Sequence, residues 1–269
     1  MKWTAKEPSS EPKKRGFIPP QTPEEKLLMK RVEELCKQVL FGGQVRSTHF
    51  LSDRQQELAA AAVNKAGEVE CYWDGGYPQA ERKILTLLPE QDFPYQPPFC
   101  SVQIEPVSKS VKLQHRDCLG AVLGLGLDRK SIGDILLHED GTGTVFCLEP
   151  AADLMEQQLS QIGRETVLIT RQDFQSQNLQ IQEREVKTAT VASLRMDAVI
   201  AAMLHCGREK AVQMIRAGKV EVNHLPVTSA HTEMYEQDIL TIRGTGRFRL
   251  EQIGGKSRKD RVFIQYYQY

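Results

Sequence analysis

The side chains that could do chemistry in this 269-residue chain are cations at helix starts and glycine turns within residues 190–269. Arg195 and Arg208 each fall in the first turn of a predicted helix, where the helix dipole disfavours a positive charge. A cation there can instead join the free backbone N–H groups in holding a phosphate. Four more cations extend this edge or flank the Gly244-Thr245-Gly246 turn: Arg216, Lys219, Arg243 and Arg247. The pattern predicts an RNA-binding surface, with a solvated basic surface as the alternative.

The sequence offers little for catalysis or metal binding. His115, Asp117 and Cys118 lie within one helical turn, and neighbours of this kind are not by themselves a catalytic triad. The stretch 124–126 has two glycines but lacks the third glycine of a dinucleotide fingerprint and follows no strand. No two of the six cysteines lie within three residues of each other, so there is no C-x-x-C zinc pair, and we expect free thiols in a reducing cytoplasm. We expect no catalytic residues, no metal and no cofactor.

Composition and the N-terminal segment exclude other classes of protein. The chain is 40% hydrophobic and 26% charged, which is typical of a globular protein and not of a disordered one. No apolar run approaches the roughly 18 residues of a membrane span. Residues 1–20 contain Lys13-Lys14-Arg15 but lack the apolar segment of a secretory signal, and Glu7 and Glu11 argue against a transit peptide. We expect a cytoplasmic protein without a membrane partner.

The charge is spread unevenly along the chain. The formal net charge is zero, from 35 basic and 35 acidic side chains. Residues 1–189 carry 23 basic and 27 acidic side chains, and residues 190–269 carry 12 and 8, so the two parts have net charges of −4 and +4. This asymmetry points to a polyanionic partner for the last part of the chain only.

Start and stop signals divide the chain into a flexible tail, 1–21, and three units that must position these side chains. The first unit, 22–79, is predicted to be helical with a small sheet. Thr22-Pro23-Glu24-Glu25 is typical of a helix start, and Gly42-Gly43 should end that helix. Ser52 and Gln55 form a capping-box pattern that opens a second helix through Ala66, and residues 68–73 alternate as a strand.

The second unit, 80–173, has a clear predicted order of elements. Strands are expected at 101–107, 135–138, 144–148 and 166–170, with one helix over 114–126 and another from Pro150 to Gly163. The order β-α-β-β-α-β predicts a ferredoxin-like sandwich, an arrangement shared by many RNA-recognition domains. Phe146 is the aromatic residue of the two central strands, and we expect it to face the core instead of stacking bases.

A polar, glutamine-rich linker is predicted over 174–190, followed by the third unit, 191–269. Ser193 is expected to cap a first helix, and Gly207 and Arg208 to open a second helix that Gly218 stops. A strand at 220–222, a hairpin over 238–250 and a last strand at 262–267 complete the unit. The predicted fold class is α+β, with an N-terminal α/β unit, a ferredoxin-like (RRM-like) middle domain and a small C-terminal αα-β domain.

Several spaced motifs agree over residues 193–249. They are Leu194-Arg195-Met196-Asp197, Arg208-Glu209-Lys210-Ala211, Ala217-Gly218-Lys219-Val220-Glu221-Val222-Asn223 and Ile242-Arg243-Gly244-Thr245-Gly246-Arg247-Phe248. Together they resemble the RNA-binding domain first seen in small-subunit ribosomal protein S-four. His224 stands where that domain usually has a glycine. The resemblance implies a set of RNA-binding residues: Arg195, Arg208, Lys210, Arg216, Lys219, Asn223, Arg243 and Arg247.

Motifs in the earlier units extend the match over about residues 69–261. Asp74-Gly75-Gly76-Tyr77, Ala80-Glu81-Arg82-Lys83, His115-Arg116-Asp117 and Gly133-Asp134-Ile135-Leu136 resemble the YlmH family of bacterial proteins, which are encoded near cell-division genes. The family implies a role in ribosome-associated quality control, on large subunits that still hold peptidyl-tRNA. The implied partners are ribosomal RNA, the large ribosomal subunit and tRNA, and we expect a monomer. Secondary RNA contacts are expected at Arg82, Lys83, His115, Arg116, Arg258 and Lys259.

Two other functions remain open on the sequence. An RNA-modifying enzyme of the pseudouridine synthase type would need a catalytic Asp in a Gly-Arg-Leu-Asp setting. Asp128-Arg129 and Asp197 are only partial matches, and we expect Asp197 to pack or cap within its helix. A cell-division scaffold is suggested by the family's gene neighbourhood alone. We therefore expect an RNA-binding protein that is not an enzyme.

Overall fold

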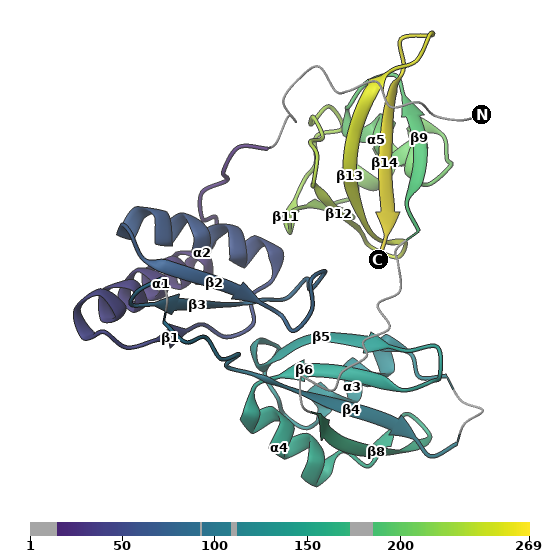
Figure 1. The fold of residues 1–269 in the computed structure, drawn as a ribbon. Helices are drawn as coiled ribbons and strands as arrows, with labels where there is room; N and C mark the ends of the chain where they lie inside the picture. The colour runs from purple at the N-terminus through teal and green to yellow at the C-terminus, as the bar shows by residue number, and fades with distance from the viewer. Residues whose placement is uncertain (1–14, 92, 109–111, 173–184) are drawn as a thin grey trace. The chain divides into compact units, whose positions relative to one another are not determined.

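The computed structural model describes residues 15–91, 93–108, 112–172 and 185–269. The first 14 residues of the predicted tail and residues 173–184, most of the predicted linker, lie outside the described residues. Over the described ranges the fold is mixed α+β, with six α-helices and three β-sheets (Figure 1). The chain forms two compact units, one made of Met1–Ile18 with Glu183–Tyr269 and the other of Pro19–Gln182. No helix in the described ranges has the length and apolar character needed to cross a membrane.

The unit Pro19–Gln182 begins with a helical hairpin on a small sheet. Helices α1 (Pro23–Gly42) and α2 (Asp53–Ala66) pack over strands β1 (Arg46–Ser47), β2 (Glu70–Asp74) and β3 (Ile84–Leu88), in the sheet order β1-β3-β2. The predicted caps are confirmed: the Thr22 side chain accepts from the Glu25 N–H, Gly43 ends α1 at a φ of 61°, and the Gln55 side chain accepts from the Ser52 N–H. The sequence pattern does not predict β3, because its residues are apolar nearly throughout and buried on both faces instead of alternating.

The same unit continues with a five-stranded antiparallel sheet. Its elements are β4 (Cys100–Pro106), α3 (His115–Gly124), the short 3₁₀ helix η1 (Arg129–Ser131), β5 (Ile132–Leu137), β6 (Gly143–Cys147), α4 (Glu149–Gln158), β7 (Gln161–Ile162) and β8 (Glu165–Gln172). The strand order is β5-β6-β4-β8-β7. The predicted end of the second helix at Gly163 is wrong. That helix ends at Gln158, and Gly163, with a φ of 61°, lies in the tight turn between β7 and β8.

Two cores lie on opposite faces of this sheet. Val145 and Cys147 of β6 belong to the larger core with α3 and α4. We call α1 through β3 the first subdomain of this unit and β4 through β8 the second. Phe146, between Val145 and Cys147, points to the other face by strand alternation and packs with Phe50 and Ile84 of the first subdomain. Phe146 is fully buried, so the prediction that it faces a core is confirmed. The first subdomain therefore covers the part of the sheet where an RNA-recognition domain would expose aromatic side chains.

The C-terminal unit packs two short helices on a six-stranded sheet. Its elements are β9 (Lys187–Val191), α5 (Met196–Met203), α6 (Arg208–Arg216), β10 (Val220–Val222), β11 (Leu225–Pro226), β12 (Ile239–Ile242), β13 (Gly246–Lys256) and β14 (Val262–Gln268). The strand order is β11-β10-β12-β13-β14-β9, and one core joins both helices to the sheet. The prediction that Ser193 caps the first helix is wrong. Arg195 is the N-cap residue, because the backbone enters α5 through the bridge between Arg195 and Glu233.

Both helices of this unit end in the same hydrogen-bonded turn. At α6 the turn residue is Gly218, with a φ of 65°, and the Lys219 N–H donates to the Met214 carbonyl. At α5 the equivalent residue is His205, with a φ of 49°, and the Cys206 N–H donates to the Ala201 carbonyl. A left-handed backbone is costly for histidine. This turn fixes where α6 and its first residue, Arg208, begin.

Candidate nucleic-acid interface

One buried carboxylate joins the two arginines at the starts of α5 and α6. Asp197 is 3% exposed, and its Oδ2 accepts from Nη2 of Arg208 at 2.6 Å and from Nη2 of Arg195 at 3.1 Å. The Oδ1 atom accepts from Nε of Arg195 at 3.2 Å. We call Arg195, Asp197 and Arg208 the arginine clamp. The sequence predicts each arginine at its own helix start, and the structure brings the two together.

The clamp keeps both cations available to a ligand. Burial raises the pKa of Asp197, but the hydrogen bonds from Arg195 and Arg208 outweigh it and hold that pKa below its usual value. Asp197 is therefore ionised at neutral pH and offsets part of the repulsion between the two guanidinium groups. The Arg195 and Arg208 side chains remain 39% and 54% exposed. Each guanidinium has five N–H donors and gives at most two to Asp197, so donors remain for a phosphate.

Four predicted cations lie exposed in the same unit. Lys210 and Arg216 are on α6, Lys219 follows its C-terminal turn, and Arg243 begins the turn between β12 and β13. Within the described ranges none of the four forms an ion pair. Arg247 is different, because its guanidinium lies 4.5 Å from the centre of the Tyr269 ring. The exposed cations can therefore bind a polyanion without first breaking an ion pair.

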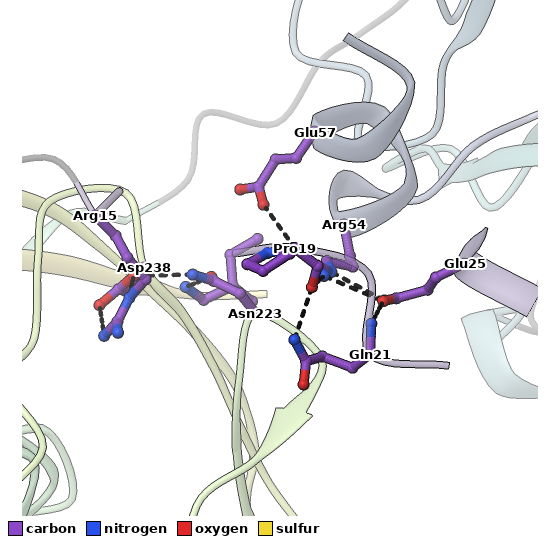
Figure 2. A network of polar contacts seen from close by, with 9 residues as sticks. Arg15, Pro19, Gln21, Glu25, Arg54, Glu57, Asn223 and Asp238 are labelled. Atoms are coloured by element: carbon purple, nitrogen blue, oxygen red, sulfur yellow. Dashed lines mark hydrogen bonds and ion pairs between the residues drawn. The ribbon is translucent and has the colours of Figure 1, made fainter. Parts of the chain in front are cut away.

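Asn223 is placed inside the fold instead of on its surface. It is 8% exposed, its Nδ2 donates to Asp238 Oδ1 at 2.9 Å, and its Oδ1 accepts from the Ile239 N–H at 2.9 Å. Asp238, 1% exposed, also accepts from Nε and Nη2 of Arg15 at 2.9 and 2.8 Å (Figure 2). The amide of Asn223 thus holds the turn after β10 to β12. Arg15, far away in the sequence, completes this buried network.

The residues predicted to make secondary contacts differ in how they are placed. The Arg82 guanidinium donates to the carbonyl oxygens of Phe50 at 2.9 Å, Ile132 at 2.9 Å and Arg129 at 3.2 Å. Arg82 therefore links the two subdomains of its unit. Of the others, Lys83 is half-buried. Four are exposed: His115, Arg116, Arg258 and Lys259.

The sequence motifs at residues 74–83 and 133–136 meet at the junction between the two subdomains, a contact that the sequence did not predict. The Asp134 carboxylate accepts from the Tyr77 hydroxyl at 2.8 Å and from the Glu81 and Arg82 N–H groups at 2.7 and 3.2 Å. Gly133 lies so close to the Phe50 ring that a Cβ atom there would be 2.6 Å from it. The acidic and glycine residues of these motifs therefore hold the two subdomains together. The sequence signal that could have indicated this junction is a glycine next to apolar residues, as at Gly133.

The His115, Asp117 and Cys118 set does not form a reactive centre. Cys118 is fully buried, and burial raises the pKa of its thiol to about 11. The thiol is therefore protonated and unreactive at neutral pH. Asp117 is exposed and pairs with Arg116 at 3.4 Å. Among the described residues no group of three His, Cys, Asp or Glu side chains is arranged to hold a metal ion.

Comparison with known proteins gives consistent results along the chain. Three family models match: "YlmH, N-terminal" over residues 24–91, "Putative RNA-binding domain in YlmH" over 91–176 and "S4 domain" over 194–234. The chain is 35% identical over 219 residues to ribosome-associated protein quality control protein P2 of Bacillus subtilis (strain 168), which covers 81% of this chain and 84% of that protein. None of these names is that of an enzyme.

A solved structure is also similar. Cell division protein ylmH from Streptococcus pneumoniae matches with a TM-score of 0.48 at 22% sequence identity, over 60% of this chain and 99% of that chain. The family models cover the two subdomains and the C-terminal helices, and the Bacillus relative covers most of the chain. The chain therefore belongs to the YlmH family, with an RNA-binding domain and a C-terminal S4 domain.

Proposed function

We propose that this protein is a cytoplasmic, non-enzymatic RNA-binding protein of ribosome-associated quality control. It binds ribosomal RNA and tRNA on large ribosomal subunits that still hold peptidyl-tRNA, as a monomer. The arginine clamp is the observation that carries the proposal. A buried carboxylate that fixes two exposed guanidinium groups at adjacent helix starts is suited to hold phosphates in a defined register. The name of the Bacillus relative supports the ribosomal setting.

The other exposed cations of the C-terminal unit extend the grip. Lys210, Arg216, Lys219 and Arg243 would contact further phosphates, with Arg247 held against Tyr269 beside them. Phosphate contacts of this kind position a protein on RNA but carry no sequence information. Recognition of one RNA site therefore depends on the shape over which these phosphates are spaced.

The middle domain has, in this proposal, the ferredoxin-like arrangement of RNA-recognition domains. The order β4-α3-β5-β6-α4-β8, with β8 and β6 flanking β4, supports it. Because Phe146 is buried against the first subdomain, this sheet would not stack bases at its centre. Any RNA contact of this domain would come from exposed side chains such as Arg116.

Charge reversal of the clamp tests the proposal. The variant Arg195→Glu/Arg208→Glu should lose co-sedimentation with large ribosomal subunits. Binding by about six phosphates should also weaken roughly a thousandfold between 50 and 200 mM salt. Lys30→Glu/Lys37→Glu on α1 changes the net charge equally at exposed positions, and it should sediment like the unaltered protein. Unchanged sedimentation of the clamp variant would refute the proposal.

A further inference from the structure

A pocket of about 410 Å³ lies in the C-terminal unit between β9 and α5. One wall is formed by residues 188–191 of β9 and by Ala192, which follows it. Because successive side chains of a strand point to opposite faces, a run of consecutive lining residues indicates that the edge of β9 borders the pocket. Among the described strands β9 pairs only with β14, so its other edge is open. The opposite wall is α5 with the turn that follows it. The volume falls within the range of roughly 300–1,000 Å³ that is usual for sites that bind small molecules.

The charged side chains of the pocket favour an anion. Arg208 and Arg261 both line it, and no lining residue, all of them within the described ranges, is acidic. Each guanidinium is already held in place. Arg208 is bonded to Asp197 at 2.6 Å, and Nε of Arg261 donates to the Thr190 hydroxyl at 3.1 Å. Cations that are fixed before binding lose little entropy when an anion arrives.

The rest of the lining favours a flat ring with polar edges. Small side chains of β9, of the residue after it and of α5 form an apolar surface: Ala189, Ala192, Ala198, Ala201 and Ala202. Hydroxyl groups of Thr188 and Thr190 and the ring of His205 supply donors and acceptors around it. A planar ring, hydrogen-bonding edges and a phosphate together describe a nucleotide.

We propose that this pocket takes one unpaired nucleotide of the bound RNA, with its base on the alanine surface and its phosphate between Arg208 and Arg261. The inference rests on the proposed RNA-binding function, because Arg208 belongs to both the clamp and the pocket. A peptide strand added to the open edge of β9 is the competing occupant. The Arg261 side chain, bonded to both the hydroxyl and the carbonyl oxygen of Thr190, works against such an added strand.

The thiol of Cys206 allows a direct test, because this residue lines the pocket and is half-exposed. The rate of its alkylation by a maleimide would be measured in the full chain, with exposed Cys71 of the other unit as the internal reference. Single-stranded RNA at saturation should slow alkylation of Cys206 about tenfold and leave Cys71 unchanged. Fully paired RNA should have no effect on Cys206. Uridine monophosphate or adenosine monophosphate alone, at millimolar concentration, should also slow the alkylation of Cys206.

The outcomes separate this inference from the proposed function. RNA that binds in an anisotropy assay but leaves Cys206 alkylation unchanged would overturn the pocket and leave RNA binding intact. Failure of RNA to bind at all would overturn the proposed function. In that case, protection of Cys206 by the mononucleotides would support a nucleotide site in the pocket, and no protection would overturn it. Protection by an extended peptide, with none by RNA or mononucleotide, would overturn the nucleotide and indicate strand addition.

A variant that fills the pocket gives a second, independent readout. Ala201→Leu should reduce the affinity for single-stranded RNA about tenfold and leave the affinity for paired RNA unchanged. Ala217→Leu, at the exposed end of α6, adds the same group outside the pocket and should change neither. Equal affinities of the Ala201→Leu variant and the unaltered protein for single-stranded RNA would contradict the inference.

Discussion

At the scale of single residues, Asp197 holds together two cations of the C-terminal unit, Arg195 and Arg208. It is a negative charge in the middle of a surface proposed to bind a polyanion, and counting charges alone would make it unfavourable. In the proposed complex, its position beneath two exposed guanidinium groups would give it the opposite effect. It would fix their spacing, so that both can reach phosphates at once.

The variant Asp197→Asn should therefore weaken RNA binding even though it makes the protein more positive. We expect a loss of about tenfold, because an amide offers the two arginines one neutral acceptor oxygen in place of two oxygens that share a negative charge. Fluorescence anisotropy with labelled RNA at two salt concentrations would measure it. Glu209→Gln removes a neighbouring exposed acid and should raise the affinity slightly. Tighter binding by Asp197→Asn would show that the clamp does not position the arginines.

The same variant should also change the dependence of stability on pH. Because the folded pKa of Asp197 lies below the unfolded value of about 3.9, its contribution to stability is present above that value and is lost as the pH falls through the folded pKa. Urea unfolding should show Asp197→Asn less stable by about 1–2 kcal/mol at pH 6, since both arginines are partly exposed. The difference between the two proteins should shrink toward pH 3. A constant difference from pH 7 to 3 would mean that the carboxylate charge is not involved.

At the scale of elements, the junction between the two subdomains depends on glycines with no room for a side chain. A Cβ atom at Gly133 would lie 2.6 Å from the Phe50 ring and 3.1 Å from the Phe146 Cβ. Gly133→Ala should destabilise the unit by about 1–3 kcal/mol through overpacking. Gly120→Ala, on α3 with open space around it, should be neutral or stabilise by up to about 1 kcal/mol. Thermal unfolding of both variants would check this, and equal midpoints would contradict it.

The sequence predicted helix ends well where they depend on residues that are close together in the chain. The caps at Thr22, Ser52 and Gly43 are found where their side chains or backbone conformation require. Strand β3 was missed because a strand buried on both faces shows no alternation. The first helix of the C-terminal unit was placed too early, since a long-range backbone bridge at Arg195 sets its start. Short-range patterns cannot show such contacts.

The candidate site was predictable only in part for the same reason. Residue types and helix starts identified Arg195 and Arg208, but the burial of Asp197 between them needs the packing of α5 against α6. Asn223 was expected on the RNA surface, and the structure gives its amide two partners inside the fold. The pocket beside β9 could not be foreseen, because β9 (Lys187–Val191) falls almost entirely within the predicted linker, so the prediction of a linker there is wrong for these residues.

At the scale of the whole molecule, the C-terminal unit draws on both ends of the described chain. Arg15 donates to the buried carboxylate of Asp238, which also accepts from the Asn223 side chain (Figure 2). The Tyr235 N–H donates to the same carboxylate. Arg15→Ala should destabilise this unit by about 1–3 kcal/mol, because it leaves a buried carboxylate without its cation. Hydrogen exchange should rise in β12 and remain unchanged in β4. Arg258→Ala, in an exposed turn, should have no such effect. Unchanged exchange in β12 would show that Arg15 adds no stability.

The bond between Arg15 and Asp238 also has a consequence for biosynthesis. The two residues are 223 positions apart, and translation makes Arg15 first and Asp238 near the end of the described chain. At roughly 5–20 residues per second, Arg15 waits on the order of 10–45 s for its partner. Through that interval the unit Pro19–Gln182 can fold while the RNA-binding unit is incomplete. The polypeptide would therefore reach its full affinity for RNA only after its own synthesis is nearly finished.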